Sequence, residues 1–363
     1  MFASGMLVCA ALAHGAPLST AKPGEIVKVQ GSLSDIPARA LSIQAAPGPV
    51  LLLSDQPERF PGDGVALQER VEPGPVRLYL YHLASGAGKT ITVVIENLSE
   101  ENLYARFSRR AVPPASRDYY HVAQAALLEY LGSSSSLTRW VSPRGRAVLD
   151  EELDARTVPP GALVHAIYEF ELDQPARISV LQRGPGEDSA AILGKLPHLQ
   201  TTHGGAGRGT FKTADFEVTA PAAYDTASGP ARLAVADGKL DHWVEGTDAL
   251  SGRPSRDTGN YGTLYRFKLQ RRSTDGRALA LVMSGNILQS GGMCKGLGTA
   301  VKVGGDVVAV PGSGSLSGPF PEAVVLQKYP PLKAGESGTI EFVYSPPGSA
   351  CLPTPLLLIP YKP

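Results

Sequence analysis

The sequence lacks several features that commonly identify a function. Its 34 basic and 34 acidic residues cancel, whereas a nucleic-acid-binding protein normally carries a basic surplus that replaces phosphate counterions. No two of the seven histidines have the spacing of metal ligands on one helix, and no Cys-x-x-Cys pair occurs, so zinc is not expected. The Gly-x-Ser-x-Gly pentapeptide of serine hydrolases is also missing. We therefore expect no nucleic-acid partner and no catalytic constellation of a familiar kind.

Cysteine is scarce, with only Cys9, Cys294 and Cys351 in 363 residues. The apolar run Met6–Ala13 is too short to cross a bilayer and ends in the Ala-x-Ala pattern of a signal-peptide cleavage site, although the usual basic start is missing. Residues 1–22 are thus predicted to be a signal peptide and leader. The mature protein would be extracellular or at the cell surface, without a transmembrane segment. In that compartment Cys294 and Cys351 are predicted to form a disulfide, the alternative being two buried thiols.

Long apolar runs are absent as well. The 40 glycines and 31 prolines separate many short apolar segments, which is typical of all-β sandwiches. A chain of this length favours two hydrophobic cores. The sequence therefore predicts an all-β protein with two β-sandwich domains of immunoglobulin-like style, at residues 23–183 and 210–363. A glycine-rich linker over 184–209 joins them.

The clearest predicted strands span 76–83, 90–97 and 102–109. In the first of them Val76, Leu78 and Leu80 alternate with Arg77, Tyr79 and Tyr81. Their short connections favour an antiparallel meander. Helical spacing of apolar residues then predicts one inserted helix over 118–131.

In the second half, one strand is predicted over 211–218. The unbroken apolar runs Val324–Leu326 and Leu356–Ile359 indicate strands that are buried on both faces.

The stretch Asp241–Phe267 contains the candidate ligand-binding residues, which are Asp241, Trp243, Asn260 and Tyr261. Aromatic faces stack on sugar rings while carboxylate and amide groups hold the hydroxyls, so this set favours carbohydrate. The alternative is that the tryptophan packs in the core at one end of a sandwich.

The same stretch overlaps the densest acid cluster, formed by Asp237, Asp241, Glu245 and Asp248. Such a loop could offer oxygen ligands to calcium, but it lacks the alternating pattern of an EF-hand loop. Solvated acids are the alternative, and no cofactor is predicted. Asp241 and Glu245 could also act as the acid–base pair of a polysaccharide hydrolase, although their spacing along the chain fixes no separation.

Six phrases of the sequence resemble a group of exported proteins of Gram-positive bacteria. Members often carry stalk-type domains named after the N-terminal domain of copper amine oxidase. The phrases are SDQPERF at 54–60, VRLYLYHLASGAGK at 76–89, SRDYYHVAQAALLEY at 116–130, RGTFKTADF at 208–216, GNYGTLYRF at 259–267 and SPPGSACLP at 345–353. The resemblance implies an extracytoplasmic, β-rich protein of the cell envelope. This chain shows no oxidase machinery, so the resemblance implies no copper chemistry. Cysteine at 294 and 351 departs from the group's pattern, which fits an added disulfide.

Together these observations favour a non-catalytic exported protein that binds or structures the cell envelope. Its partner would be a glycan or another envelope polymer. One alternative is a polysaccharide-acting hydrolase that uses the loop carboxylates. Another is a subunit of a surface layer or filament, which would bind copies of itself by adding strands edge to edge.

Overall fold

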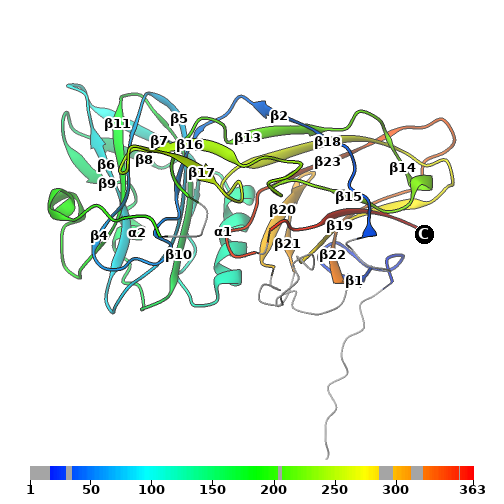
Figure 1. The fold of residues 1–363 in the computed structure, drawn as a ribbon, viewed down its shortest axis with the longest axis horizontal. Coiled ribbons are helices and arrows are strands. Elements are labelled where there is room, and N and C mark those ends of the chain that lie inside the picture. The colour runs from blue at the N-terminus through cyan, green and yellow to red at the C-terminus, as the bar shows by residue number, and fades with distance from the viewer. Residues whose placement is uncertain (1–16, 30–34, 203–206, 286–296, 312–321, 351) are drawn as a thin grey trace, which may run out of the picture.

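The computed structural model describes residues 17–29, 35–202, 207–285, 297–311, 322–350 and 352–363. These residues form four sheets, paired into two sandwiches that lie side by side along the long axis of the molecule (Figure 1). The predicted all-β sandwich class is confirmed. Residues 1–16 of the expected signal peptide and leader, and the cysteines Cys9, Cys294 and Cys351, lie outside the described residues, whereas residues 17–22 are described and Ala21 among them is buried.

The first sandwich pairs an eight-stranded sheet, in the order β17-β16-β12-β3-β5-β10-β7-β8, with a four-stranded sheet, β4-β11-β6-β9. The strands of the larger sheet are β3 (Val50–Ser54), β5 (Gly74–Leu83), β7 (Leu103–Ala111), β8 (Thr138–Val141), β10 (Leu163–Leu172), β12 (Arg208–Phe211), β16 (Val244–Asp248) and β17 (Arg253–Asp257). Those of the smaller sheet are β4 (Gly64–Val71), β6 (Thr90–Asn97), β9 (Arg146–Val148) and β11 (Ala176–Arg183). Two short helices, α2 (Glu151–Asp154) and α3 (Ser189–Ile192), also belong to this half of the chain.

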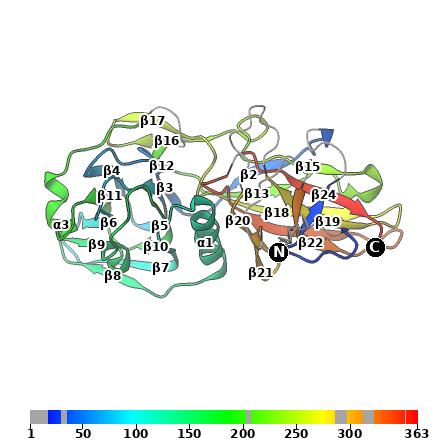
Figure 2. The same ribbon diagram turned by 90° about the horizontal axis from the view of Figure 1, so that it is seen from below.

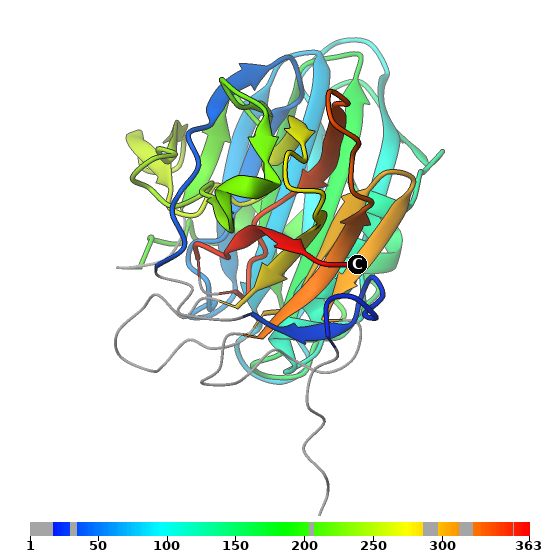
Figure 3. The ribbon, with the colours of Figure 1, turned by 90° about the vertical axis from the view of Figure 1, so that its right-hand side faces the viewer.

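The second sandwich contains the sheets β1-β22-β19-β24-β15 and β2-β13-β18-β23-β20-β21, with β14 paired to β18. The strands of the former are β1 (Ile26–Lys28), β15 (Ala231–Leu233), β19 (Ala278–Ser284), β22 (Glu322–Tyr329) and β24 (Leu356–Tyr361). Those of the latter are β2 (Ser42–Ala46), β13 (Asp215–Thr219), β14 (Tyr224–Asp225), β18 (Leu264–Arg272), β20 (Thr299–Val303), β21 (Asp306–Val310) and β23 (Gly338–Tyr344). The C-terminus lies at the far end of this sandwich, which faces the viewer in Figure 3.

The predicted meander is wrong, although its three strands exist. β5 lies between β3 and β10, and β7 lies between β10 and β8, whereas β6 belongs to the opposite sheet between β11 and β9. The short connections therefore cross from one sheet to the other instead of forming hairpins. Alternation of apolar residues specifies which face of a strand is buried, but it does not specify the neighbouring strand.

The apolar runs in β22 and β24 are buried on both faces, as predicted. Val324, Leu326, Leu356 and Leu358 point into the sandwich core. The alternate side chains of both strands point outward, where residues of the N-terminal segment cover them, among them Ala21, Val27, Val29 and Ile36.

Strand pairing crosses the predicted domain boundary in both directions. β1 and β2, from the start of the chain, pair with β22 and β13 of the second sandwich. β12, β16 and β17 extend the larger sheet of the first sandwich through the pairing of β12 with β3. The single strand predicted over 211–218 is divided in the structure. Residue 211 ends β12 in one sandwich and residues 215–218 belong to β13 in the other.

The predicted helix is α1 (Tyr119–Gly132), and it fills the junction between the sandwiches (Figure 2). Asp118 caps it by accepting a hydrogen bond from the His121 backbone N–H. Its buried side chains, including Ala126 and Leu127, pack with Tyr79 and Tyr81 from the outer face of β5. Both faces of β5 are therefore buried, since Val76, Leu78 and Leu80 belong to the core of the first sandwich.

A buried arginine also joins the two sandwiches. Arg77 of β5 is 1% exposed, and its guanidinium forms ion pairs with Glu169 at 2.9 Å and Asp215 at 2.8 Å. It also donates to the backbone carbonyls of Ala214 and Gly262. Because Asp215 belongs to β13 of the second sandwich, this network fixes the two halves in one arrangement.

No helix within the described residues is both long and apolar enough to cross a membrane.

Candidate functional site

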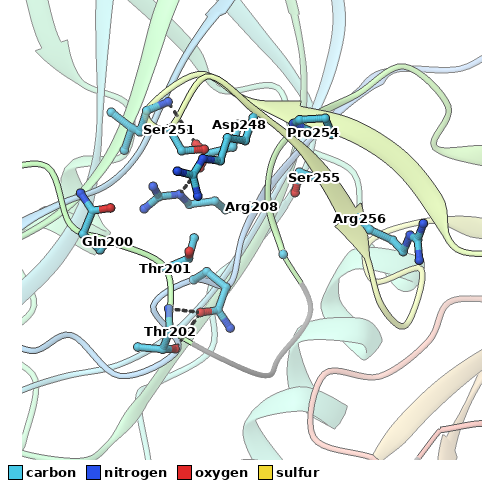
Figure 4. A pocket seen from close by; sticks show the side chains of 13 residues that line it. Gln200, Thr201, Thr202, Arg208, Asp248, Ser251, Pro254, Ser255 and Arg256 are labelled. Carbon is cyan, nitrogen blue, oxygen red and sulfur yellow. Dashed lines mark hydrogen bonds and ion pairs between the residues drawn. The ribbon is translucent and has the colours of Figure 1, made fainter.

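A polar pocket of about 500 Å³ lies at one edge of the eight-stranded sheet. The β16–β17 hairpin forms one wall and the segment 200–202 forms the other (Figure 4). Hydroxyl and amide side chains dominate its lining, namely Gln200, Thr201, Thr202, Ser251 and Ser255. Three arginines, at 208, 253 and 256, also line the pocket. Such a lining suits a hydrophilic ligand with many hydrogen-bonding groups.

The base of the pocket is a buried ion pair. Arg208 of β12 and Asp248 of β16 are almost completely buried, and Arg208 Nε donates to Asp248 Oδ2 at 2.9 Å. Arg208 Nη1 also donates to the carbonyl oxygens of Ala66 and Leu199. Asp248 Oδ1 accepts a hydrogen bond from the backbone N–H of Leu250. Each member of the pair is held by several partners, so this base is rigid.

Glycine allows β12 and β16 to approach closely at this base. A Cβ atom on Gly209 would lie 2.0 Å from the carbonyl oxygen of Thr247, and the Gly209 φ of +128° is one that side chains rarely allow. A Cβ atom on Gly246 would lie 2.3 Å from the carbonyl oxygen of Thr210. The close pairing that places Arg208 beside Asp248 therefore depends on these two residues.

Side chains from neighbouring elements hold both walls. Glu69 of β4 accepts hydrogen bonds from the Ala249 backbone N–H and the Thr210 hydroxyl, and burial raises the pKa of its carboxyl. On the other wall, Gln56 Oε1 accepts from the backbone N–H and the hydroxyl of Thr202, at 3.0 and 2.8 Å. Both walls are thus preorganised, which lowers the entropy cost of binding.

The rim carries positive charge. Arg256 pairs with Glu245 at 3.0 Å, and both side chains are largely exposed. Arg253 is exposed, and within the described part of the chain no carboxylate pairs with it. Its guanidinium can therefore donate to a ligand hydroxyl, carboxylate or phosphate without first breaking an ion pair.

Two of the predicted binding residues meet in a buried network outside this pocket. Asp241 Oδ2 accepts hydrogen bonds from the Tyr265 hydroxyl and from the Ala236 backbone N–H. Asn260 donates to the Tyr265 hydroxyl at 2.7 Å and accepts from the Val244 backbone N–H at 2.8 Å. Burial raises the pKa of Asp241. These side chains brace the loop that leads into β16.

The side chains of the two predicted aromatic residues are not members of that hydrogen-bond network. The indole of Trp243 packs on Gly238, where an added Cβ atom would lie 2.4 Å from the ring, and it contacts the core of the second sandwich. Tyr261 stacks on Tyr79 with ring centroids 6.3 Å apart. Neither aromatic residue, nor Asp241 or Asn260, lines the polar pocket.

The acids of the predicted cluster have separate partners. Asp237 accepts hydrogen bonds from the backbone N–H groups of residues 239–241, Glu245 pairs with Arg256, and Asp248 pairs with Arg208. The described residues contain no group of three or more His, Cys, Asp or Glu side chains that could hold a metal ion.

The residues of the pocket were not predicted from the sequence. The sequence feature that could have indicated them is the polar segment Ser251–Arg256. Its Gly252 adopts a φ of +65° at the turn between β16 and β17. A glycine turn between two short segments is a hairpin signal. Neither a family model nor a curated protein matches this sequence.

Proposed function

We propose that this protein is a non-catalytic, extracytoplasmic protein of the cell envelope that binds a glycan in the polar pocket. The observation that carries this proposal is the lining, in which hydroxyls, amides and Arg253, which has no ion pair within the described residues, surround the rigid base formed by Arg208 and Asp248. Sugar hydroxyls both donate and accept hydrogen bonds, as do the threonine, serine and glutamine side chains around them.

Size and rigidity support the same class of ligand. A volume of about 500 Å³ lies in the range of pockets that hold small ligands. The charge balance of the lining, with three arginines and one aspartate, favours a sugar that bears a carboxylate or phosphate group. We therefore expect an acidic envelope glycan to bind more tightly than a neutral one.

The proposed location rests on sequence features. The apolar run with its Ala-x-Ala pattern supports export. The resemblance to exported Gram-positive proteins with copper-amine-oxidase-N-terminal-like stalk domains supports the envelope as the place of action.

The proposal is tested by co-sedimentation of the purified protein with cell-envelope fractions and insoluble glycans. The wild type should be retained. Arg253→Ala should bind at least about tenfold more weakly, because it removes a charge-assisted hydrogen bond. Arg70→Ala, which removes an exposed arginine on β4, is the matched control and should bind like the wild type. Equal retention of all three proteins, or of none, would contradict the proposal.

The hydrolase alternative is less well supported by the geometry. Asp241 is committed to Tyr265 and to a backbone N–H, and Glu245 is paired with Arg256, so the two carboxylates share no partner. Asp257 has a carboxyl pKa that burial raises well above its usual range, as a general acid requires, but it is 0% exposed. A substrate cannot reach it in this arrangement.

A further inference from the structure

A second surface on the first sandwich is aromatic and exposed. Trp140 lies on β8, the strand at the opposite edge of the eight-stranded sheet from the β16–β17 hairpin, and is 53% exposed. Its partner across the strands is Tyr104 of β7. Side chains of directly opposed residues project from the same face of a sheet. The two rings therefore share one face at this edge.

That face is the outer one. Leu103, Ala105 and Phe107 of β7 and Val141 of β8 point into the sandwich core. The alternation of strand side chains consequently places Tyr104, Arg106 and Trp140 on the other side of the sheet. We call these three residues the aromatic platform.

Polar groups border the platform and hold it in place. The guanidinium of Arg106 lies 5.3 Å from the centre of the Tyr104 ring and pairs with Asp173 at 3.1 Å. Asp173 also accepts a hydrogen bond from the Tyr104 backbone N–H at 2.8 Å. The arginine of the platform is thus paired with a carboxylate, unlike Arg253 in the pocket, for which the described residues provide no ion pair.

We propose that the aromatic platform is a second carbohydrate site, which stacks the apolar face of an uncharged pyranose ring. A tryptophan normally buries a large apolar area, so one left half exposed beside a tyrosine has the geometry of a stacking surface. Because its neighbouring charges are paired, the platform lacks the basic surplus that an anionic membrane or a nucleic acid would require. The Arg106–Asp173 pair offers a donor and an acceptor to hydroxyls at the ring edge.

This inference rests on the proposed glycan-binding function but concerns a different surface. Six strand spacings separate β16 from β8 in the sheet, which is roughly 30 Å at the usual distance between strands. A short oligosaccharide that reaches one site does not reach the other. The platform and the pocket can therefore be tested independently.

The test uses the intrinsic fluorescence of the two tryptophans, Trp140 and Trp243. Neutral β-linked glucose and N-acetylglucosamine pentasaccharides, which present flat apolar ring faces, are titrated into the full protein. The emission of the wild type should change saturably, and the change should vanish in Trp140→Phe, where only Trp243 emits. Trp140→Ala should bind the pentasaccharide at least about tenfold more weakly in calorimetry.

Two control variants distinguish pentasaccharide binding at the aromatic platform from binding in the polar pocket. Leu240→Ala removes another exposed apolar side chain, 65% exposed, and should bind the pentasaccharide like the wild type. Arg253→Ala should keep the full fluorescence change. No change in wild-type emission, or a change that persists in Trp140→Phe, would overturn the platform whatever the result for the pocket. Dimerisation that depends on Trp140, measured by sedimentation velocity without sugar, would also overturn it by assigning the surface to self-contact.

Discussion

Asp257 at the end of β17 provides a sharp test of the structure. Its side chain is 0% exposed, and neither of its carboxylate oxygens has a hydrogen-bond partner of ordinary geometry among the described residues. Burial raises the pKa of this carboxyl well above its usual range, and the nearby backbone N–H of Tyr261 offsets the rise only in part. The folded protein therefore holds a proton on Asp257 that the unfolded chain releases above a pKa of about 3.9.

The sign of the pH effect follows from this difference. Because the folded state holds the extra proton, Asp257 makes the protein less stable as the pH rises from about 4 towards the folded pKa. A difference of one bound proton between the folded and unfolded states changes the free energy of unfolding by about 1.4 kcal/mol per pH unit. Asp257→Asn has no proton to lose. The free energy of unfolding of the variant, minus that of the wild type, should therefore increase by about 1.4 kcal/mol per pH unit from about pH 4.5 upward, until the pH approaches the folded pKa.

Urea unfolding of both proteins at several pH values measures this difference. Other titrating groups are common to both proteins, so their contributions cancel in the subtraction. Thr138→Ser, a change at an exposed position of β8 that alters no titratable group, serves as the control and should give a constant difference. A constant difference for Asp257→Asn as well would refute the reasoning, since it would mean that Asp257 ionises equally in the folded and unfolded states.

Three further changes test other parts of the structure by urea unfolding. Burial lowers the pKa of His165 to about 3, so His165 contributes a loss of about 1.4 kcal/mol in the free energy of unfolding per pH unit as the pH falls below about 6.5. His165→Leu should remove that loss, and an unchanged acid sensitivity would contradict the assignment. Asp248→Asn leaves Arg208 buried without its carboxylate and should lower the free energy of unfolding by about 3–5 kcal/mol; a loss below about 1 kcal/mol would show that the pair is solvated. Gly209→Ala should cost about 1–3 kcal/mol through its clash with the backbone, clearly more than Gly252→Ala, whose Cβ would meet open space.

Local patterns along the chain predicted individual elements well. The apolar spacing after Asp118 predicted α1 almost to its ends, and the β-branched run at 90–97 predicted β6. These elements follow from residue preferences and burial periodicity, which act over a few neighbouring positions. The alternation in β5 also assigned its two faces correctly, but it could not show that the second face is covered by α1.

Pairing between distant segments could not be predicted in the same way. The placement of β1 and β2 in the second sandwich depends on contacts with β22 and β13, hundreds of residues away in the first case. The pocket has the same origin, because Gln56, Thr202 and Arg253 come together only when β12 pairs with β3 and β16. Arg208 belongs to the segment 208–216, one of the six that carry the family resemblance. The neighbouring sequence nevertheless does not indicate that its ion-pair partner is Asp248.

The candidate residues show why residue type alone was an incomplete guide. Asp241 and Asn260 are the types that hold sugar hydroxyls, but here each is buried and bonded to Tyr265. A buried polar side chain needs partners of its own, and the same chemistry that binds a ligand also braces a loop. The exposed tryptophan is Trp140, whose strand was not predicted, rather than Trp243.

The most direct test of the account is amide hydrogen exchange of the wild type with and without the envelope glycan that it retains. If the polar pocket is the glycan site, protection should increase at residues 200–202 and along the β16–β17 hairpin over 248–256, and this increase should be lost in Arg253→Ala. Protection that leaves both walls of the pocket unchanged and appears elsewhere in the molecule would contradict the account.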